Sequence, residues 1–145
     1  MLKIKSIKKV FAAGSINEKI ALNNISLSLE EGEFLTIIGD NGAGKSTLLN
    51  CIAGEYIIDE GHILLGGIDI SYMPEYKRAR FIGRVFQNPL KGTAFDMTIE
   101  ENLAIAYAKG KAKGLRAGIN KKDIKLFREK LSLLNLGLED RMNQK

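Results

Sequence analysis

The sequence has little cysteine, proline and histidine: its 145 residues include one cysteine, two prolines, one histidine and no tryptophan. A single cysteine, Cys51, excludes an internal disulfide framework and is typical of a small buried residue. No apolar run approaches the roughly 18 residues of a membrane-spanning helix. Residues 1–7 alternate between apolar and polar, which predicts a strand and not an export signal. We therefore expect a cytoplasmic protein with one globular fold.

The charge of the chain is unevenly distributed. The net charge is +5, but residues 109–130 hold nine lysines and arginines against two acidic residues, which leaves −2 for the remainder. A basic segment of this kind can bind nucleic acid or an acidic membrane surface. Because aromatic residues are nearly absent from it, the segment is more typical of a solvated helical face, and no nucleic-acid partner is expected.

Residues 39–47 carry the most specific pattern of the chain. They fit Gly-x-x-x-x-Gly-Lys-Ser/Thr at every fixed position. Residues 34–38 before them are apolar and β-branched, which predicts a buried strand, and apolar residues recur after them at helical spacing. The order of strand, glycine loop and helix predicts a phosphate-binding loop with these members: Gly39, Asp40, Asn41, Gly42, Ala43, Gly44, Lys45, Ser46 and Thr47.

The residue types of this loop suit phosphate chemistry. Glycines let successive main-chain N–H groups approach an anion, and the start of the helix directs its positive dipole end to the same place. Lys45 would supply a charge to the outer phosphates, Ser46 a hydroxyl to Mg²⁺, and Thr47 a hydroxyl to the innermost phosphate. The alternative interpretation is an ordinary glycine-rich turn with a surface lysine.

Hydrophobic periodicity divides the remaining chain into a strand-rich part and a helical part. We expect strands at residues 2–10, 20–29 and 81–86, a hairpin at residues 63–67 and a short helix at residues 74–80. The composition changes after Gln87. The predicted division is therefore a nucleotide-binding core at residues 1–87 and a connector with helices at residues 88–145.

Two helices are expected in the second part. Thr98 and Glu101 form a capping-box pattern before the first of them. After a Gly/Lys-rich connector at residues 110–118, Asn120 would cap the second helix and Gly137 would end it. Its core face is predicted to hold Ile124, Phe127, Leu131 and Leu134.

The chain resembles the ATP-binding subunit of an ABC transporter, and the resemblance covers its whole length. The glycine loop and the segment from Arg84 to Pro89 carry it. This resemblance implies an α/β fold, the ABC type of P-loop NTPase, with an N-terminal antiparallel β subdomain and the start of a helical subdomain. It implies ATP and Mg²⁺ as ligands. Gln87 would contact Mg²⁺ and the attacking water, with Lys45 as the second catalytic residue, and Phe11 would stack on adenine. The alternatives are a polar strand end for Gln87 and a core position for Phe11.

The resemblance also implies partners and missing parts. The sequences of residues 88–94 and 98–104 resemble those of bacterial importers. The ATP-binding subunits of such importers pair head to tail. They are held at the inner face of the membrane by permease subunits. The segment at residues 88–97 would dock the permease, with Phe95 and Met97 as apolar candidates for the contact. The alternative is that these two side chains pack under the connector. The signature loop, catalytic acid and switch histidine of the family do not occur, so we expect an N-terminal portion that binds ATP without efficient hydrolysis.

Several alternatives oppose this interpretation. Asp59 and Glu60 follow an apolar run and mimic the catalytic acidic strand, but their place before a hairpin argues against it; His62 is expected at an exposed strand position. Residues 120–123 fit the Asn-Lys-x-Asp motif of GTPases. A helix cap is favoured over this motif, because no Asp-x-x-Gly follows the glycine loop and a Gly/Lys connector stands where a buried strand should lead into the motif. A soluble ABC ATPase of translation or repair and a non-hydrolysing nucleotide-binding module also remain open.

Overall fold

The computed structural model describes residues 1–108 and 119–144. The chain divides into two compact units, Met1–Ile82 and Gly83–Lys145, which we call unit 1 and unit 2. The connector at residues 110–118 and much of the basic segment lie outside the described residues.

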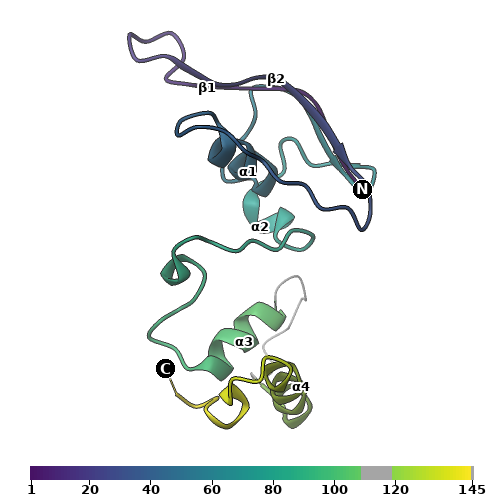
Figure 1. The fold of residues 1–145 in the computed structure, drawn as a ribbon, viewed down its shortest axis with the longest axis vertical. Helices are drawn as coiled ribbons and strands as arrows, with labels where there is room; N and C mark the ends of the chain where they lie inside the picture. Colours follow the sequence, from purple (N-terminus) through teal and green to yellow (C-terminus); the bar gives the residue numbers. More distant parts are fainter. Residues whose placement is uncertain (109–118, 145) are drawn as a thin grey trace. The chain divides into compact units, whose positions relative to one another are not determined.

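Unit 1 is built on a four-stranded antiparallel sheet with the order β2-β1-β3-β4 (Figure 1). The strands are β1 (Leu2–Phe11), β2 (Lys19–Leu29), β3 (Glu60–Leu65) and β4 (Ile68–Asp69). Leu2 pairs with Leu29 on one side and with Leu65 on the other. The alternating segments predicted as strands and the hairpin are therefore confirmed. Ile4, Leu22 and Ile63 of the three longer strands are buried, while both residues of the short β4 are exposed.

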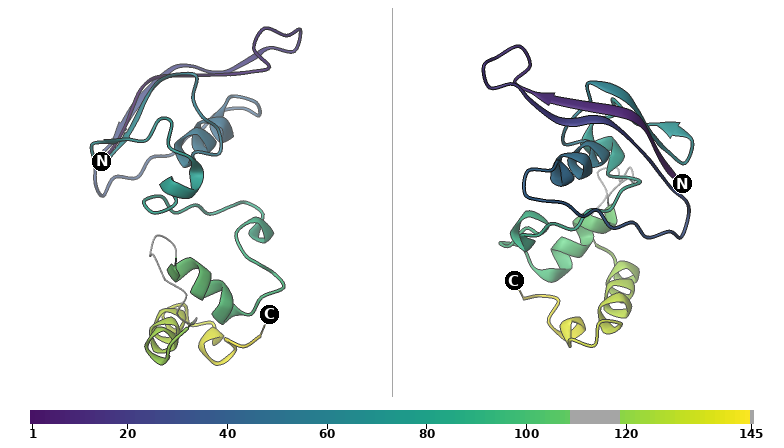
Figure 2. Two further views of the ribbon diagram at one scale, coloured as in Figure 1. Left: turned by 180° about the vertical axis from the view of Figure 1, so that it is seen from behind. Right: turned by 45° about the horizontal axis from the view of Figure 1, so that its top comes forward.

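The first helix, α1 (Lys45–Ala53), lies on one face of this sheet, as Figures 1 and 2 show. Its Leu48 and Cys51 are buried, and the cysteine is fully enclosed, as predicted. The short helix α2 (Glu75–Arg78) follows the hairpin within the same unit. The core joins helix and sheet through these buried side chains: Ile4, Ile7, Leu22, Leu48, Cys51, Ile58, Ile63 and Ile70.

Two predicted strands are wrong. Residues 34–38 and 81–86 are not part of any sheet among the described residues. Phe34 is 93% exposed and Val85 is 98% exposed. A strand with both faces apolar needs backbone partners and covering layers on each side, and the described residues provide none for these two segments.

The described part of unit 2 contains two helices, α3 (Ile99–Ala108) and α4 (Lys121–Ser132), and two single turns, η1 (Pro89–Lys91) and η2 (Leu138–Asp140). Both predicted caps are confirmed. Thr98 Oγ1 accepts from the Glu101 amide over 3.2 Å, and Asn120 Oδ1 accepts from the Asp123 amide over 3.0 Å. The predicted face of α4 is right for its first three members and wrong for Leu134, which is exposed because the helix ends at Ser132.

The amides in the first turn of α3 donate to carbonyls at residues 142–144 and at Thr98. The amide of Ile99 donates to the Gln144 carbonyl and that of Glu100 to the Met142 carbonyl, both over 2.9 Å. The Asn102 amide donates to the Thr98 carbonyl over 3.0 Å. Together with the Thr98 cap, every one of the first four amides of α3 has an acceptor.

None of the helices in the described parts of the chain is long and apolar enough to cross a membrane.

Candidate phosphate-binding site

The glycine loop packs directly against strand β2. Gly42 and Gly44 adopt left-handed backbone conformations, with φ of 88° and 91°. A Cβ atom on Gly44 would lie 2.5 Å from the carbonyl oxygen of Ala21 and 3.3 Å from the side chain of Leu22. Both the backbone angle and the close approach therefore require glycine at position 44.

Helix α1 begins at Lys45 without a side-chain cap. Its N-cap residue is Gly44, and its first turn contains no acidic residue. The first amides of a helix lack intrahelical acceptors, and the helix dipole makes this end positive. The sequence thus leaves the end of α1 available to an external anion.

The Lys45 ammonium group lies over the loop. Its Nζ donates to the carbonyls of Gly39 over 2.6 Å and Asp40 over 2.7 Å. The Ala43 amide donates to the Asp40 carbonyl over 3.2 Å, which closes a turn beneath it. The loop therefore brings a positive charge and main-chain donors to one place.

The two residues that follow Lys45 carry hydroxyl groups, which can bind phosphate oxygens or a metal ion. Ser46 is exposed and Thr47 is half-buried at the start of α1. Within residues 1–108 and 119–144, no group of three histidine, cysteine or acidic side chains could hold a metal ion. The Ser46 hydroxyl is an oxygen ligand of the kind that Mg²⁺ accepts together with substrate phosphates and water.

Phe11 ends strand β1 and packs against Tyr56. The two rings meet edge to face, with centroids 5.2 Å apart and planes at 81°. Lys9 Nζ lies 5.7 Å from the centroid of the Phe11 ring. The sequence did not single out Tyr56 as a neighbour, and the stacking of Phe11 on adenine remains a prediction.

Gln87 lies in unit 2, exposed, at a bend just before η1. Further along, an apolar groove of about 490 Å³ opens beside α3. Asn102, which the sequence analysis missed, shapes this groove: its side chain accepts from the Ala94 amide over 2.8 Å and donates to the Ala94 carbonyl over 2.9 Å. Phe95 is 67% exposed within it. Its lining comprises Gly92, Thr93, Ala94, Phe95, Met97, Ile99, Asn102, Leu103 and Ala106.

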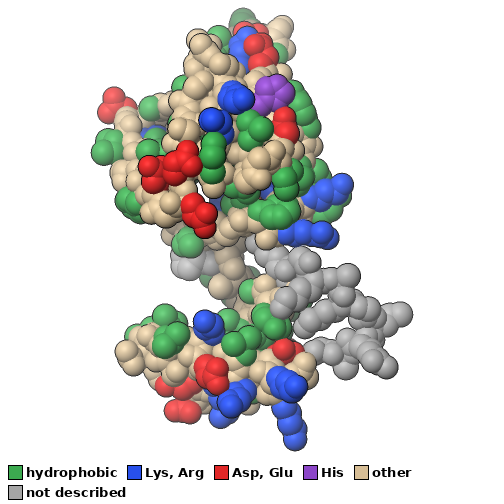
Figure 3. All heavy atoms as spheres, turned by 90° about the vertical axis from the view of Figure 1, so that its right-hand side faces the viewer, with side chains coloured by type: hydrophobic (Ala, Val, Ile, Leu, Met, Phe, Trp, Pro, Cys, Tyr) green, Lys and Arg blue, Asp and Glu red, His purple; other side chains and the backbone are tan. Residues whose placement is uncertain are grey.

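The competing motifs have structural partners of their own. Asp59 accepts from the Val10 amide over 2.6 Å and pairs with Lys9 over 3.0 Å. His62 is an exposed residue of β3, as predicted, and Figure 3 shows the single histidine at the surface. Asn120 and Asp123 bond to each other's amides at the start of α4, which confirms the helix-cap interpretation of the GTPase-like motif.

Comparison with known proteins agrees with this geometry. The family model described as "ABC transporter" matches residues 22–144. The tyrosine transport ATP-binding protein of Clostridioides difficile is 44% identical over 116 residues, which are 80% of this chain and 46% of that protein. The spermidine/putrescine import ATP-binding protein PotA of Haemophilus influenzae is 38% identical over 104 residues, 72% of this chain and 26% of that protein.

Solved structures give the same result. The ATP-binding cassette MJ0796, described as a dimer after hydrolysis with bound ADP and Pi, matches all of this chain with a TM-score of 0.78 and 29% identity. A nucleotide-free cassette from an ABC transporter matches with a TM-score of 0.72 and 30% identity. The chain covers 61% and 57% of these two structures, and less than half of the two named relatives. By its glycine loop, its fold and these matches, the chain belongs to the ABC transporter family.

Proposed function

We propose that this chain binds ATP at residues 39–47 and is the nucleotide-binding portion of a transport system subunit. One observation carries the proposal: a glycine loop held against β2 places the Lys45 ammonium group at the uncapped N-terminus of α1. Main-chain amides and a fixed cation at one point provide what a triphosphate requires. The named relatives, which are ATP-binding proteins, support this choice of ligand.

Each residue of the loop has a role in this proposal. The amides of Gly42 and of residues 44–47 would donate to phosphate oxygens, and Lys45 would exchange its two carbonyl partners for the outer phosphates. The Ser46 hydroxyl would take one position on Mg²⁺. Bound there, Mg²⁺ would neutralise charge on the phosphates. Gln87 would respond to the γ-phosphate, as the resemblance implies, and Phe11 would stack on the base.

We further propose that the whole protein couples ATP hydrolysis to solute movement through permease subunits. The names of the two relatives support transport, and one of them supports import. Pairing of two copies is supported by the neighbour described as dimeric, and the head-to-tail arrangement is what the resemblance implies. Such a subunit would lie at the inner face of the membrane without entering it.

The groove beside α3 is our candidate for the permease contact. Its lining is mainly apolar, and Phe95 and Met97 expose flexible or aromatic surface there. Exposed apolar surface of this kind on a folded unit is typical of a protein-protein contact. The groove follows Gln87 by only a few residues, so a change at Gln87 on nucleotide binding could reach it through a short stretch of chain.

Calorimetry on the 145-residue chain tests the ligand. ATP with Mg²⁺ is titrated into the wild type, into Lys45→Ala and into Lys3→Ala, which removes an exposed lysine of β1. We expect Lys45→Ala to bind at least about ten times more weakly, because a charged hydrogen bond to phosphate is lost. Lys3→Ala should bind like the wild type. Equal affinities of wild type and Lys45→Ala, or a preference for GTP, would overturn the proposal.

A further inference from the structure

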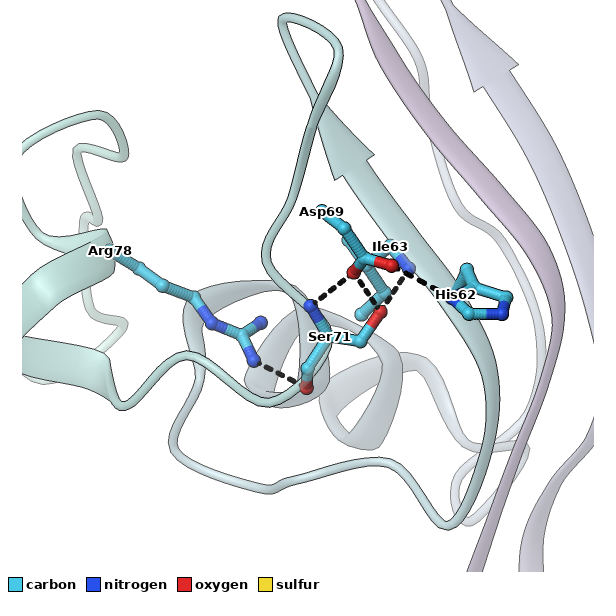
Figure 4. A network of polar contacts seen from close by, with 5 residues as sticks. All are labelled: His62, Ile63, Asp69, Ser71 and Arg78. Carbon is cyan, nitrogen blue, oxygen red and sulfur yellow. Dashed lines mark hydrogen bonds and ion pairs between the residues drawn. The ribbon is translucent and has the colours of Figure 1, made fainter.

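Arg78 is the largest fully buried side chain of unit 1, with no exposed surface. Its hydrogen bonds among the described residues go to main-chain carbonyls. Nε donates to Met73 over 2.6 Å. Nη2 donates to Ser71 over 2.9 Å, the bond that Figure 4 shows. Within the described parts of the chain it forms no ion pair with a carboxylate. A buried cation bound only by carbonyls is rare unless it holds something in place.

The guanidinium group holds the end of α1. Its Nη1 donates to the carbonyls of Cys51 over 2.7 Å and Ile52 over 3.0 Å, both in the last turn of the helix. That turn contains no basic residue of its own. The last carbonyls of a helix lack intrahelical donors and form the negative end of its dipole, so a buried cation there stabilises the helix strongly.

Gly54 is shaped by the same contact. It ends α1 with φ of 90°, and a Cβ atom at this position would lie 2.8 Å from Nε of Arg78. Only glycine combines this backbone conformation with so close a guanidinium group. The end of α1 and Arg78 are therefore packed as one piece.

The opposite end of α1 is the phosphate loop. The helix has nine residues and is about 13 Å long. A helix of this length behaves as a rigid rod, so a shift at Cys51 moves Lys45 and the first amides by a similar distance. Binding groups displaced by even one ångström lose much of their affinity and catalytic effect.

We propose that Arg78 is a positioning residue for the phosphate loop. By fixing the carbonyl end of α1, it sets where the Lys45 amine and the first amides of the helix stand. The inference rests on the proposed nucleotide site and adds to it a residue that touches no ligand. The main chain of Arg78 also accepts from the amides of Phe81 over 2.9 Å and Ile82 over 3.0 Å, so the same residue fixes the start of the segment that continues to Gln87.

A second set of contacts holds Arg78 in turn. The Ser71 carbonyl that accepts from Arg78 belongs to a residue whose amide donates to Asp69 Oδ1 over 2.9 Å. The Ser71 hydroxyl donates to the same carboxylate oxygen and accepts from the Ile63 amide over 2.8 Å (Figure 4). The hairpin of β3 and β4 thereby fixes one of the four carbonyls that surround the guanidinium group.

These side chains do not form a nucleophile. Asp69 accepts from both the Ser71 hydroxyl and the His62 ring, and no bond joins serine to histidine among the described contacts. Ser71 is also buried. The cluster of serine, histidine and aspartate therefore supports structure, in contrast to a hydrolase triad, where the histidine accepts the serine proton.

The test separates positioning from folding. Arg78→Met keeps an unbranched apolar stem at this position and removes the donors; Ile63→Val is the control, because it loosens the same core without touching α1 carbonyls. Denaturation gives the folded fraction of each variant. ATP with Mg²⁺ is then titrated under conditions in which both variants are folded. We expect Arg78→Met to bind at least about ten times more weakly per folded molecule and Ile63→Val to stay within about twofold of the wild type.

Arg78→Lys covers the case in which Arg78→Met does not fold. It keeps the charge but cannot reach the same set of carbonyls, so we expect weaker ATP binding and faster amide exchange at Leu48. In the wild type, saturating ATP should also shift the Arg78 Nε–H resonance. Wild-type affinity in a folded Arg78 variant, or an unmoved resonance, would overturn the positioning role. Equal affinity of wild type and Lys45→Ala would instead overturn the nucleotide site itself.

Discussion

The Asp59 carboxylate accepts a hydrogen bond from the amide of Val10 over 2.6 Å. Its other oxygen accepts from Lys9 Nζ over 3.0 Å, and its own amide donates to the Lys8 carbonyl over 3.0 Å. Asp59 therefore joins the segment after α1 to strand β1. An acidic residue that looks catalytic in the sequence is bound to the sheet through both oxygens.

Asp59→Ala should lower stability and leave nucleotide binding unchanged. The loss should be about 1 kcal/mol, at the lower end for a charged hydrogen bond, because the side chain is 40% exposed to solvent. Urea denaturation measures the loss, and calorimetry with ATP measures binding. Asp59→Asn, which keeps an acceptor for the Val10 amide, is the control and should lose less. A loss of nucleotide affinity without loss of stability would contradict the structural role.

Gly44→Ala and Gly42→Ala form a matched pair. Both glycines have φ near 90°, but only a Cβ on Gly44 meets a neighbour, the Ala21 carbonyl at 2.5 Å. Gly42→Ala should cost about 1 kcal/mol through the left-handed backbone alone. Gly44→Ala should cost at least about 1 kcal/mol more, since something must move. Denaturation of both variants measures the difference, and equal losses would mean that the loop does not rest on β2 in solution.

Phe11→Ala distinguishes stacking from packing. If the ring stacks on adenine, the variant should bind ATP about 1–3 kcal/mol more weakly and bind tripolyphosphate unchanged. Titration of both ligands into wild type and variant gives the answer. A parallel loss for both ligands would show that the edge-to-face contact with Tyr56 is the only role of Phe11.

The stability of the hairpin should depend on acid pH through Asp69. Hydrogen bonds from the Ser71 hydroxyl, the Ser71 amide and His62 lower the pKa of Asp69 from 3.8 to about 2. A carboxyl whose pKa is lower in the folded state stabilises the fold above its unfolded pKa and loses that effect as pH falls to its folded pKa. The stability difference between wild type and Asp69→Asn should therefore be constant above about pH 5 and shrink between pH 4 and 2. Urea titrations across this range measure it; a difference that persists at pH 2 would contradict the assignment.

In the complete transport system, Gln87→Ala should spare ATP binding and separate hydrolysis from transport. A side chain that binds only when the γ-phosphate is present gives the differential affinity that a conformational switch requires. Transport and hydrolysis are measured together in vesicles.

Crosslinks from Phe95→Cys, at the exposed edge of the groove, should reach a membrane-embedded subunit. Normal transport by the Gln87 variant, or crosslinks to ribosomal proteins, would favour a soluble ATPase instead.

Local patterns in the sequence predicted local structure well. Each of the correctly predicted features is specified within about a dozen residues. They are the alternating strands β1 and β2, the helix caps at Thr98 and Asn120, and the glycine loop before α1. The strand predicted at residues 34–38 is wrong. An apolar β-branched run shows that a segment can be buried, but a strand also needs a neighbouring strand that hydrogen-bonds with its backbone.

Arg78 shows a different limit of sequence analysis. It stands between Lys77 and Arg80 in a basic, exposed-looking segment, and its partners Cys51 and Ile52 lie more than twenty positions away. The one signal in the sequence is negative: α1 ends in a glycine with no basic residue in its last turn. Such a helix needs a donor from elsewhere, but periodicity cannot say which residue provides it.

The carbonyls of Met142 and Gln144 accept from the Glu100 and Ile99 amides, and so they connect the start of α3 to residues that follow α4 in the sequence. Loss of these two carbonyls would leave both amides without their acceptors. Fraying of α3 would then start beside the groove that holds Phe95. The lifetime of this surface therefore depends on residues 142–144, which lie far from it in the sequence.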